Sequence, residues 1–359
     1  MEKVTKGLFR ITGFAGDQGG CGVIRVAIPF QLLNQLHVKN FEFQAYFNNI
    51  FTKDLAYYIN STIIQFQRSA TQRHLEVFEL VRGKIKKLSR SALVYEIDDD
   101  LYNIPKWNFA YNYYAPLLPY VSDMLSRADA ISVSTDTLKN LYSKFNKNIY
   151  IIPNHLPKFL WGDPTFNANQ GKPRIVYPCS SNHFGYNKDN PGGDIGPKLM
   201  DFIKKTTNDY DWIFVGGMPI ELENEVKDGK ITRHKWFSVY EYPRFLRSLN
   251  PDIGIAPLEV MTFNRSKSNI KSQEYTALGI PGVYTKIDPY TSMSLQAQDE
   301  EEFISHIELL RDIDVRHQVW QKDYKTLADE LFWEDNNYKN LKKYVLTYLN
   351  IAGKTADFF

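Results

Sequence analysis

The sequence predicts an α/β protein with two doubly wound parallel-sheet domains in tandem and a helical tail. Strand-like and helix-like segments alternate, which is typical of a parallel sheet covered by helices. A stretch rich in proline and asparagine interrupts the alternation once, and the length of 359 residues suits two domains. We expect a first domain at 1–155, a linker at 156–172, a second domain at 173–322, and helices at 323–359 that pack back on the first domain.

The elements follow from short apolar runs for strands and from apolar residues at helical spacing for helices. In the first domain we expect strands at 8–14, 61–66, 92–97, 130–133 and 149–152, and helices at 23–36, 71–82 and 135–145. In the second domain we expect strands at 174–177, 212–215, 253–256 and 282–284, and helices at 195–206, 240–249, 271–278 and 300–312. Ligands of open parallel sheets bind beyond the carboxyl ends of strands, so the loops after strands are candidate sites.

Composition argues against several classes of protein. Hydrophobic residues make up 43% of the chain and charged residues 23%, enough to bury large cores. No apolar run reaches the roughly 18 residues of a membrane span and no signal peptide opens the chain, so we expect a cytoplasmic protein without stable membrane insertion. Cys21 and Cys179 are too few for a disulfide scaffold or a cysteine zinc site. The net charge of +2 does not by itself indicate nucleic-acid binding.

A glycine-rich loop follows the first predicted strand and leads into a helix. Gly19, Gly20, Cys21 and Gly22 would let the backbone approach a ligand, and the helix start favours negative charge. Arg25, in the first helical turn, could hold an anionic group. The spacing matches neither the dinucleotide fingerprint nor the P-loop, and a tight turn without a ligand is the alternative interpretation.

Three consecutive acids, Asp98, Asp99 and Asp100, follow the predicted strand at 92–97. Adjacent like charges disfavour ionisation unless a cation or hydrogen-bond donors compensate. Such a cluster could orient sugar hydroxyls or accept a proton from an attacking hydroxyl. A helix cap with a solvated turn is the alternative, and no nearby histidine in the sequence indicates a metal site.

Loops of the second domain carry further candidates. Ser180, Ser181 and His183 follow the strand at 174–177, where hydroxyls suit phosphate or sugar contacts and His183 could donate to a substrate oxygen. Gly216 follows the strand at 212–215, and Trp236 could stack on a base. A structural histidine and a buried tryptophan are the alternatives.

The most specific segment runs from Phe263 to Pro281. Its polar candidates lie before and within the predicted helix at 271–278: Asn264, Lys267, Asn269, Lys271 and Glu274. Cations at a helix start neutralise a diphosphate, and a carboxylate can accept both hydroxyls of a ribose. An ordinary helix with a solvated basic face is the alternative.

Five segments together resemble nucleotide-sugar glycosyltransferases of the two-domain GT-B fold, especially the retaining family-four type: GGCGVIRVAIPFQLL, VYEIDDDLYNIP, ADAISVST, IYIIPN and IGIAPLEVMTFNRSKSNIKSQEYTALGIP. The resemblance implies two Rossmann-like domains that face a central cleft. It implies a donor diphosphate against Lys267 and Lys271, helped by Ser180, Ser181 and Asn269. It also implies a ribose on Glu274, the glycine loop against the donor, and an acceptor near Asp98 to Asp100.

The resemblance further implies retention by same-face attack and no metal or other cofactor, because side chains and helix dipoles stabilise the leaving diphosphate. Many members carry two acids eight residues apart at the helix that holds Glu274. Here Ser266 occupies the first of these positions, which leaves the identity of the sugar open.

A narrower resemblance links GGCGVIRV, YEIDDD and QEYTALG to bacteriophage α-glucosyltransferases, which modify 5-hydroxymethylcytosine in DNA. It implies hexosyl or pentosyl transfer from a UDP-sugar to double-stranded phage DNA in the host cytoplasm. A DNA acceptor requires a basic face, and the candidates are Arg68, Arg73, Lys84, Lys86 and Lys87. A solvated helix end is the alternative for this cluster.

Two other functions remain open at this point. The same chemistry could act on a cell-surface glycan or a lipid-linked sugar. A non-catalytic protein of the same fold could bind a nucleotide sugar or DNA. A dinucleotide-dependent oxidoreductase is the least favoured class, because the glycine fingerprint is missing.

Overall fold

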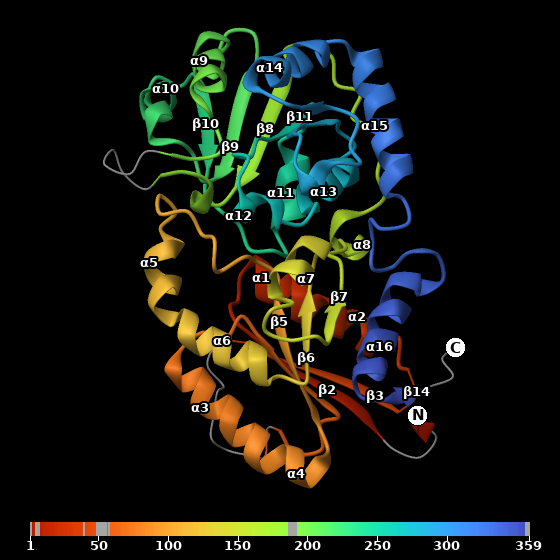
Figure 1. Cartoon of the computed structure of the whole chain (residues 1–359). Helices are drawn as coiled ribbons and strands as arrows, with labels where there is room; N and C mark the ends of the chain where they lie inside the picture. Colours follow the sequence, from red (N-terminus) through yellow and green to blue (C-terminus); the bar gives the residue numbers. More distant parts are fainter. Residues whose placement is uncertain are drawn as a thin grey trace. The chain divides into compact units, whose positions relative to one another are not determined.

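The computed structural model describes residues 2–3, 8–38, 40–47, 56, 58–185 and 192–355. Their contacts divide the chain into two compact units. Unit 1 comprises residues 1–102, 114–155 and 333–359, and unit 2 comprises residues 103–113 and 156–332. Each unit contains a six-stranded parallel sheet with helices packed on it, which confirms the predicted α/β class (Figure 1).

The sheet of unit 1 has the strand order β3-β2-β4-β5-β6-β7, with every neighbouring pair parallel. The strands are β2 Phe9–Ala15, β3 Phe41–Phe47, β4 Ile63–Gln67, β5 Ala92–Ile97, β6 Ala130–Val133 and β7 Ile149–Ile151. This is the flavodoxin-type order with one strand added, and its switch point lies between β2 and β4. The glycine loop follows β2, so it opens at that switch point.

Two long helices of unit 1 each contain a π-helical turn. The first runs through α1 Gly20–Gly22, a π turn Val23–Ala27 and α2 Ile28–Gln35. Pro29 has no N–H to bond the carbonyl of Arg25, which accounts for the widened turn there. The second runs through α3 Gln72–Leu80, a π turn Val81–Ile85 and α4 Lys86–Ser89.

The remaining helices of unit 1 include α6 Leu118–Arg127, α7 Asp136–Tyr142 and, from the end of the chain, α16 Lys339–Ile351. The hydroxyl of Tyr348 in α16 donates to Gln65 Oε1 of β4 at 2.7 Å. A two-stranded sheet joins β1 Glu2–Lys3 to β14 Lys354–Thr355. Helix α5 Ala110–Tyr114 spans the boundary between the two units.

The sheet of unit 2 has the order β10-β9-β8-β11-β12-β13, again all parallel. The strands are β8 Arg174–Cys179, β9 Asp211–Gly216, β10 Ile231–His234, β11 Ile253–Ala256, β12 Gly282–Thr285 and β13 Gln296–Ala297. This is the dinucleotide-binding order 3-2-1-4-5-6, whose switch point lies between β8 and β11.

Two hydrophobic cores hold unit 2 together. One core buries residues of α11 Tyr242–Ser248 and α13 Ile270–Leu278, and the other buries residues of α9 Pro197–Lys205 and α14 Glu300–Leu309. The other helices of the unit are α8 Lys158–Trp161, α10 Glu223–Lys227, α12 Thr262–Arg265 and α15 Ile313–Leu327. Both switch-point strands, β8 and β11, contribute to both cores, which fixes the ends where ligands bind in this fold.

Within the two six-stranded sheets, strands β3, β10 and β13 are absent from the sequence-based prediction. All three lie at an edge of their sheet. Only Phe43 is buried in β3 and only Ile231 in β10, and β13 has two residues. An edge strand need not be an apolar run, so the hydrophobic pattern gives little indication of it.

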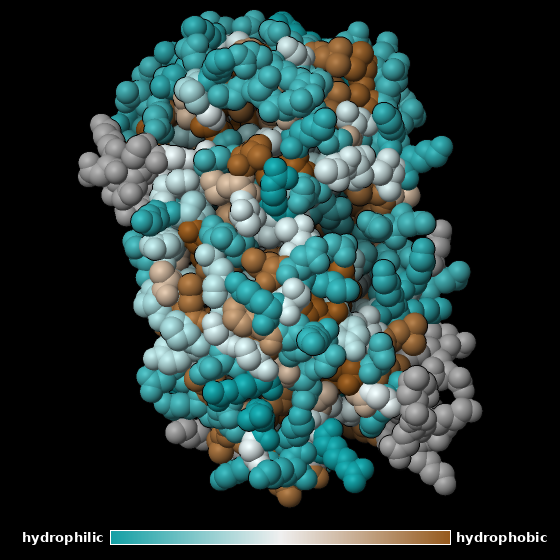
Figure 2. Space-filling model, in the orientation of Figure 1, coloured by the Kyte–Doolittle hydropathy of each residue, from teal (hydrophilic) through white to brown (hydrophobic). Residues whose placement is uncertain are grey.

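Among the described residues, no helix is both long enough and apolar enough to cross a bilayer. On the face drawn in Figure 2, hydrophilic residues predominate and hydrophobic residues form small separate areas.

Candidate functional site

In unit 1, the glycine loop is held by Asp17. Its Oδ1 accepts hydrogen bonds from the N–H groups of Gly19 and Gly22, at 2.8 and 3.1 Å. A Cβ at Gly22 would lie 2.0 Å from the carbonyl oxygen of Asp17, so only glycine fits there, whereas a Cβ at Gly20 would meet nothing within 4 Å. The carboxylate of Asp17 therefore engages two of the loop amides that the sequence assigned to a ligand.

Arg25 lies in the interior of unit 1 rather than on an anion site. Its guanidinium is nearly buried, and its Nε donates to Glu96 Oε1 at 2.7 Å. Its Nη1 donates to the carbonyl of Ile152 at 2.6 Å and to Asn154 Oδ1 at 2.8 Å. Burial raises the pKa of Glu96 to about 7, although Arg25 favours the charged carboxylate. The expectation that Arg25 binds an anion is thus corrected to a buried ion pair.

The three acids after β5 divide into two kinds. Asp98 and Asp99 pair with Arg68, at 3.4 Å from Nε to Asp98 Oδ1 and 2.5 Å from Nη2 to Asp99 Oδ2. Asp100 is fully buried, and its Oδ1 accepts from the N–H of Tyr102. The side chain of Asp99 is more accessible than that of Asp98, at 26% against 10% exposed.

The position of Arg68 differs from the expectation that it belongs to a basic face for DNA, because its side chain is largely buried. Its side chain is 14% exposed, and its Nη1 donates to Cys21 Sγ at 3.3 Å. Burial raises the pKa of the Cys21 thiol, although the charge of Arg68 lowers it. Arg68 therefore joins the glycine loop to Asp98 and Asp99, and we call Asp98, Asp99 and Arg68 the acid cluster.

The other basic candidates lie along the helix formed by α3 and α4. Arg73, Lys84 and Lys87 are exposed. Lys86 is half-buried and pairs with Asp129. One further exposed cation of this helix, Arg82, pairs with Glu79 at 3.3 Å.

In unit 2, the ends of β8 and β9 and the start of α13 bring several predicted residues together. Lys271 Nζ lies 2.6 Å from Glu274 Oε2. The hydroxyl of Tyr242 donates to the same oxygen at 3.0 Å, and Lys271 Nζ donates to that hydroxyl at 3.3 Å. Burial and the Glu274 charge raise the pKa of Tyr242, which keeps its hydroxyl a donor.

Lys267 completes this group, and we call Lys267, Lys271, Glu274 and Tyr242 the lysine cluster. The ammonium of Lys267 lies over the ring of Phe263, 5.0 Å from its centroid. The charges of both lysines lower the pKa of Cys179, the last residue of β8, against the stronger opposing effect of burial. The cluster therefore lies at the carboxyl edge of the sheet, where the positive end of α13 also favours an anion.

The neighbouring loops supply an aromatic surface. Gly216, at the end of β9, has φ +91°, and a Cβ there would lie 2.5 Å from Cys179 O and 2.6 Å from the Trp236 ring. The indole of Trp236 stacks on Tyr242 with centroids 5.2 Å apart, and Trp236 is 47% exposed. Trp236 thus presents an open ring surface beside the lysine cluster.

The other polar candidates occupy the same unit. Ser180 and Ser181 are exposed directly after β8, and Asn269 is the N-cap of α13, although its side chain makes no cap hydrogen bond. Asn264 is buried, and its Nδ2 donates to Asp194 Oδ1 at 2.7 Å. Asn264, which the sequence predicted to bind the donor, therefore holds the side chain of Asp194.

Asp194 pairs with His183, and the sequence analysis did not identify it. Its Oδ2 lies 2.7 Å from His183 Nδ1, and its Oδ1 accepts from the N–H of Glu259 at 2.7 Å. Burial and the charges of Lys267 and Lys271 lower the pKa of His183, while Asp194 acts in the opposite direction. The only sequence signal for Asp194 is its position between glycines just before α9, and Tyr242 has no comparable signal.

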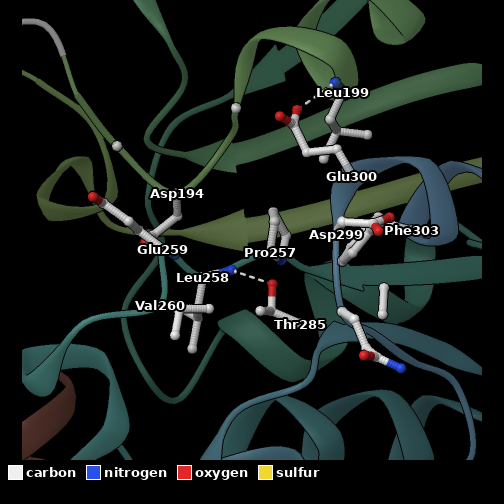
Figure 3. A pocket seen from close by; sticks show the side chains of 14 residues that line it. Asp194, Leu199, Pro257, Leu258, Glu259, Val260, Thr285, Asp299, Glu300 and Phe303 are labelled. Atoms are coloured by element: carbon white, nitrogen blue, oxygen red, sulfur yellow. Dashed lines mark hydrogen bonds between the residues drawn. The ribbon is translucent and has the colours of Figure 1, made fainter.

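A small pocket of about 220 Å³ adjoins Asp194 on the side of α9 and α14 (Figure 3). Two carboxylates at the start of α14, Asp299 and Glu300, line this pocket, and each accepts a hydrogen bond from a backbone N–H in the first turn of a helix. Asp299 Oδ1 accepts from Glu302 N at 2.9 Å, and Glu300 Oε2 accepts from Leu199 N at 2.7 Å. Across the described part of the chain, no group of three or more His, Cys, Asp or Glu residues is arranged to hold a metal ion.

Comparisons with known proteins support the fold. Sucrose-phosphate synthase from Thermosynechococcus elongatus superposes over 97% of this chain and 100% of its own, with a TM-score of 0.62 and 11% identity. A mutant of S. aureus TarM in complex with fondaparinux, α-GlcNAc-glycerol and UDP superposes over 93% of this chain and 59% of its own, with a TM-score of 0.54 and 11% identity. No family model matches the sequence, and no curated protein matches it. At such identities the similarity establishes the fold alone.

Proposed function

We propose that the protein is a glycosyltransferase that takes its sugar from a UDP-sugar. The observation that carries the proposal is the lysine cluster, in which two ammonium groups and a carboxylate lie at the start of α13 beside the switch point of a Rossmann-order sheet. The fold shared with sucrose-phosphate synthase and with a TarM structure that holds UDP supports the same class of donor.

Each residue of the cluster has a role in this proposal. Lys267 and Lys271 hold the donor diphosphate, where the start of α13 adds a favourable dipole. Glu274 accepts the ribose hydroxyls, and Tyr242 holds the Glu274 carboxylate in place. The exposed ring of Trp236 stacks on the uracil.

The chemistry is a single exchange of bonds at the anomeric carbon. The acceptor hydroxyl oxygen bonds to that carbon, the bond from the carbon to the diphosphate oxygen breaks, and the electron pair leaves with the diphosphate. The two lysines stabilise the charge that develops there, so the proposed reaction needs no metal. Asp99 of the acid cluster takes the hydroxyl proton. We propose same-face attack with retention.

For the acceptor we propose the hydroxyl of 5-hydroxymethylcytosine in double-stranded DNA. The supporting observation is the exposure of Arg73, Lys84 and Lys87 along one helix of unit 1, where phosphate contacts can form. A base within a duplex must be flipped out before it reacts, so DNA affinity and turnover are separate measurements.

The test incubates the full chain with a panel of UDP-sugars and DNA that contains 5-hydroxymethylcytosine, followed by digestion and mass analysis of the nucleosides. We expect one donor to give a hexose or pentose mass shift. UDP release without a shift in the DNA would exclude that acceptor and direct the search to glycans. The absence of both UDP release and a mass shift would contradict the glycosyltransferase proposal.

Two variants tie the activity to the site. Lys267→Met and Lys271→Met should each lower turnover about 100-fold or more, the size of effect seen when one stabiliser of transition-state charge is removed. Lys267→Met is the cleaner variant, because removing Lys271 also takes away the cation that pairs with the buried Glu274 carboxylate. Lys286→Met is the matched control, since Lys286 is exposed elsewhere in unit 2 and should keep wild-type turnover.

A further inference from the structure

We infer that the diphosphate site of unit 2 is proton-coupled: His183, positioned by Asp194, takes up a proton when the donor binds and then donates a hydrogen bond from Nε2 to a diphosphate oxygen. The inference rests on the proposed function, because it takes a diphosphate against Lys267 and Lys271 as the ligand. It adds Asp194 as a positioning residue and gives the site a pH dependence.

Asp194 cannot turn away from His183. Its side chain is 1% exposed, and each of its oxygens has partners. Oδ1 accepts from Glu259 N and from Asn264 Nδ2, both at 2.7 Å, while Oδ2 faces His183 Nδ1 at 2.7 Å. The backbone holds the pair as well, since the N–H of Asp194 donates to the carbonyl of His183 at 3.0 Å.

The Asp194 carboxylate determines the tautomer of His183. A carboxylate only accepts hydrogen bonds, so the Nδ1 of a neutral His183 must carry the proton and Nε2 must be bare. A diphosphate oxygen is also only an acceptor. It can therefore form a hydrogen bond with Nε2 only if His183 becomes an imidazolium.

The charges around His183 act on its pKa in opposite directions. Asp194 favours the imidazolium form of His183, whereas burial and the charges of Lys267 and Lys271 disfavour it. The balance lowers the pKa of His183 in the protein without a donor. The hydroxyl of Tyr177 on β8 lies 3.5 Å from Nδ1, and burial raises its pKa, so it stays neutral. A bound diphosphate offsets the charge of both lysines and adds negative charge. An opposite charge within about 4–6 Å of an imidazolium raises its pKa by about 1–3 units.

Donor binding and protonation of His183 favour one another. If donor binding raises the pKa of His183, the complex binds more protons than the free protein between the two pKa values. Donor affinity must then rise as pH falls through that window, about tenfold for each unit of pKa change.

The experiment is calorimetric titration of the full chain with the UDP-sugar that the panel selects, in buffers of different ionisation enthalpy from pH 6 to pH 8. The diphosphate of a UDP-sugar is a diester and carries no group that titrates in this range. We expect uptake of more than about 0.3 proton per site near neutral pH and at least about tenfold tighter binding at pH 6 than at pH 8. Binding without proton uptake would overturn this inference alone. No binding of any UDP-sugar would overturn the proposed function and this inference with it.

Asp194→Asn isolates the positioning role. Oδ1 of residue 194 meets two donors, so the amide oxygen takes that place and the NH2 group faces His183 Nδ1. His183 should then switch to the tautomer protonated at Nε2, and proton uptake should disappear. Histidine ¹⁵N shifts report the tautomer, and the His183 signals are assigned by their loss in His183→Gln.

Controls keep the test independent of simple damage to the fold. Asp209→Asn removes an exposed carboxylate from the same unit and should retain wild-type uptake and tautomer. His183→Gln removes the titrating group without changing Asp194 and should also abolish the uptake. Wild-type uptake in His183→Gln would overturn the inference, as would an unchanged His183 tautomer in a folded Asp194→Asn.

Discussion

Arg25 occupies a sequence position typical of an anion site, yet its side chain forms a buried ion pair with Glu96. It follows the glycine loop directly, yet the π turn and the β5 strand place its guanidinium against Glu96 inside unit 1. A charge that is nearly buried needs a partner and hydrogen bonds, and Arg25 finds them in Glu96, Ile152 and Asn154. The sequence contains no local signal for these partners, because they lie 71 to 129 residues away.

Arg25→Met should lower the free energy of unfolding by about 3–5 kcal/mol at pH 8, because it leaves the Glu96 carboxylate buried without a counter-charge. The double variant Arg25→Met with Glu96→Gln should recover most of this loss, since neither charge then remains. Urea unfolding of the wild type and both variants measures the difference. Equal losses in the single and double variants would show that the ion pair is not the source of the stability.

The lysine cluster illustrates which site residues a sequence can reveal. Lys267, Lys271 and Glu274 lie within one helix start, so their spacing carries the information. Asp194 lies in the loop before α9 and Tyr242 is the first residue of α11, and only the fold brings them to His183 and Glu274. Local spacing therefore predicted the charges of the candidate site but not the residues that orient them.

At the scale of elements, helix α3 begins with a capping box in which histidine takes the usual place of glutamate. The hydroxyl of Thr71 accepts from His74 N at 3.3 Å, and His74 Nδ1 accepts from Thr71 N at 3.3 Å and Ala70 N at 3.0 Å. Burial, with a smaller effect from Arg73, lowers the pKa of His74 to about 4. A protonated His74 could not accept these bonds, so the helix start depends on its neutral form.

This cap should make stability depend on pH in a defined direction. The unfolded His74 titrates near 6.5 and the folded one near 4, so the unfolded state binds more protons between these values. The contribution is present above pH 6.5 and is lost as pH falls towards 4, by about 1–2 kcal/mol once partial exposure is allowed for. His74→Gln should remove this part of the pH dependence of the urea midpoint. A variant with the wild-type profile would refute the role of the cap.

The elements also show why the predicted fold was confirmed while some strands were missed. Central strands such as β4 and β11 are buried on both faces, and their apolar runs predicted them. Strands β3, β10 and β13 lie at sheet edges and lack such runs. The parallel class and the central strands were therefore predictable, but the full strand order was not.

At the scale of the whole molecule, the chain does not divide at one point. Residues 103–113 follow the acid cluster in sequence but belong to unit 2. Trp107 packs there against Gly192, where a Cβ would lie 2.7 Å from the indole, and Asn108 Nδ2 donates to the carbonyl of Asn182 at 3.0 Å. Such long-range exchange of segments leaves no signal in local composition, which is why the boundaries drawn from the sequence keep residues 103–113 in the first domain.

A crystal structure of the full chain with UDP would show whether the lysine cluster binds the donor. We expect the diphosphate against Lys267 and Lys271, the ribose hydroxyls on Glu274 and the uracil on the Trp236 ring. UDP bound elsewhere, with the lysine cluster empty, would contradict this expectation.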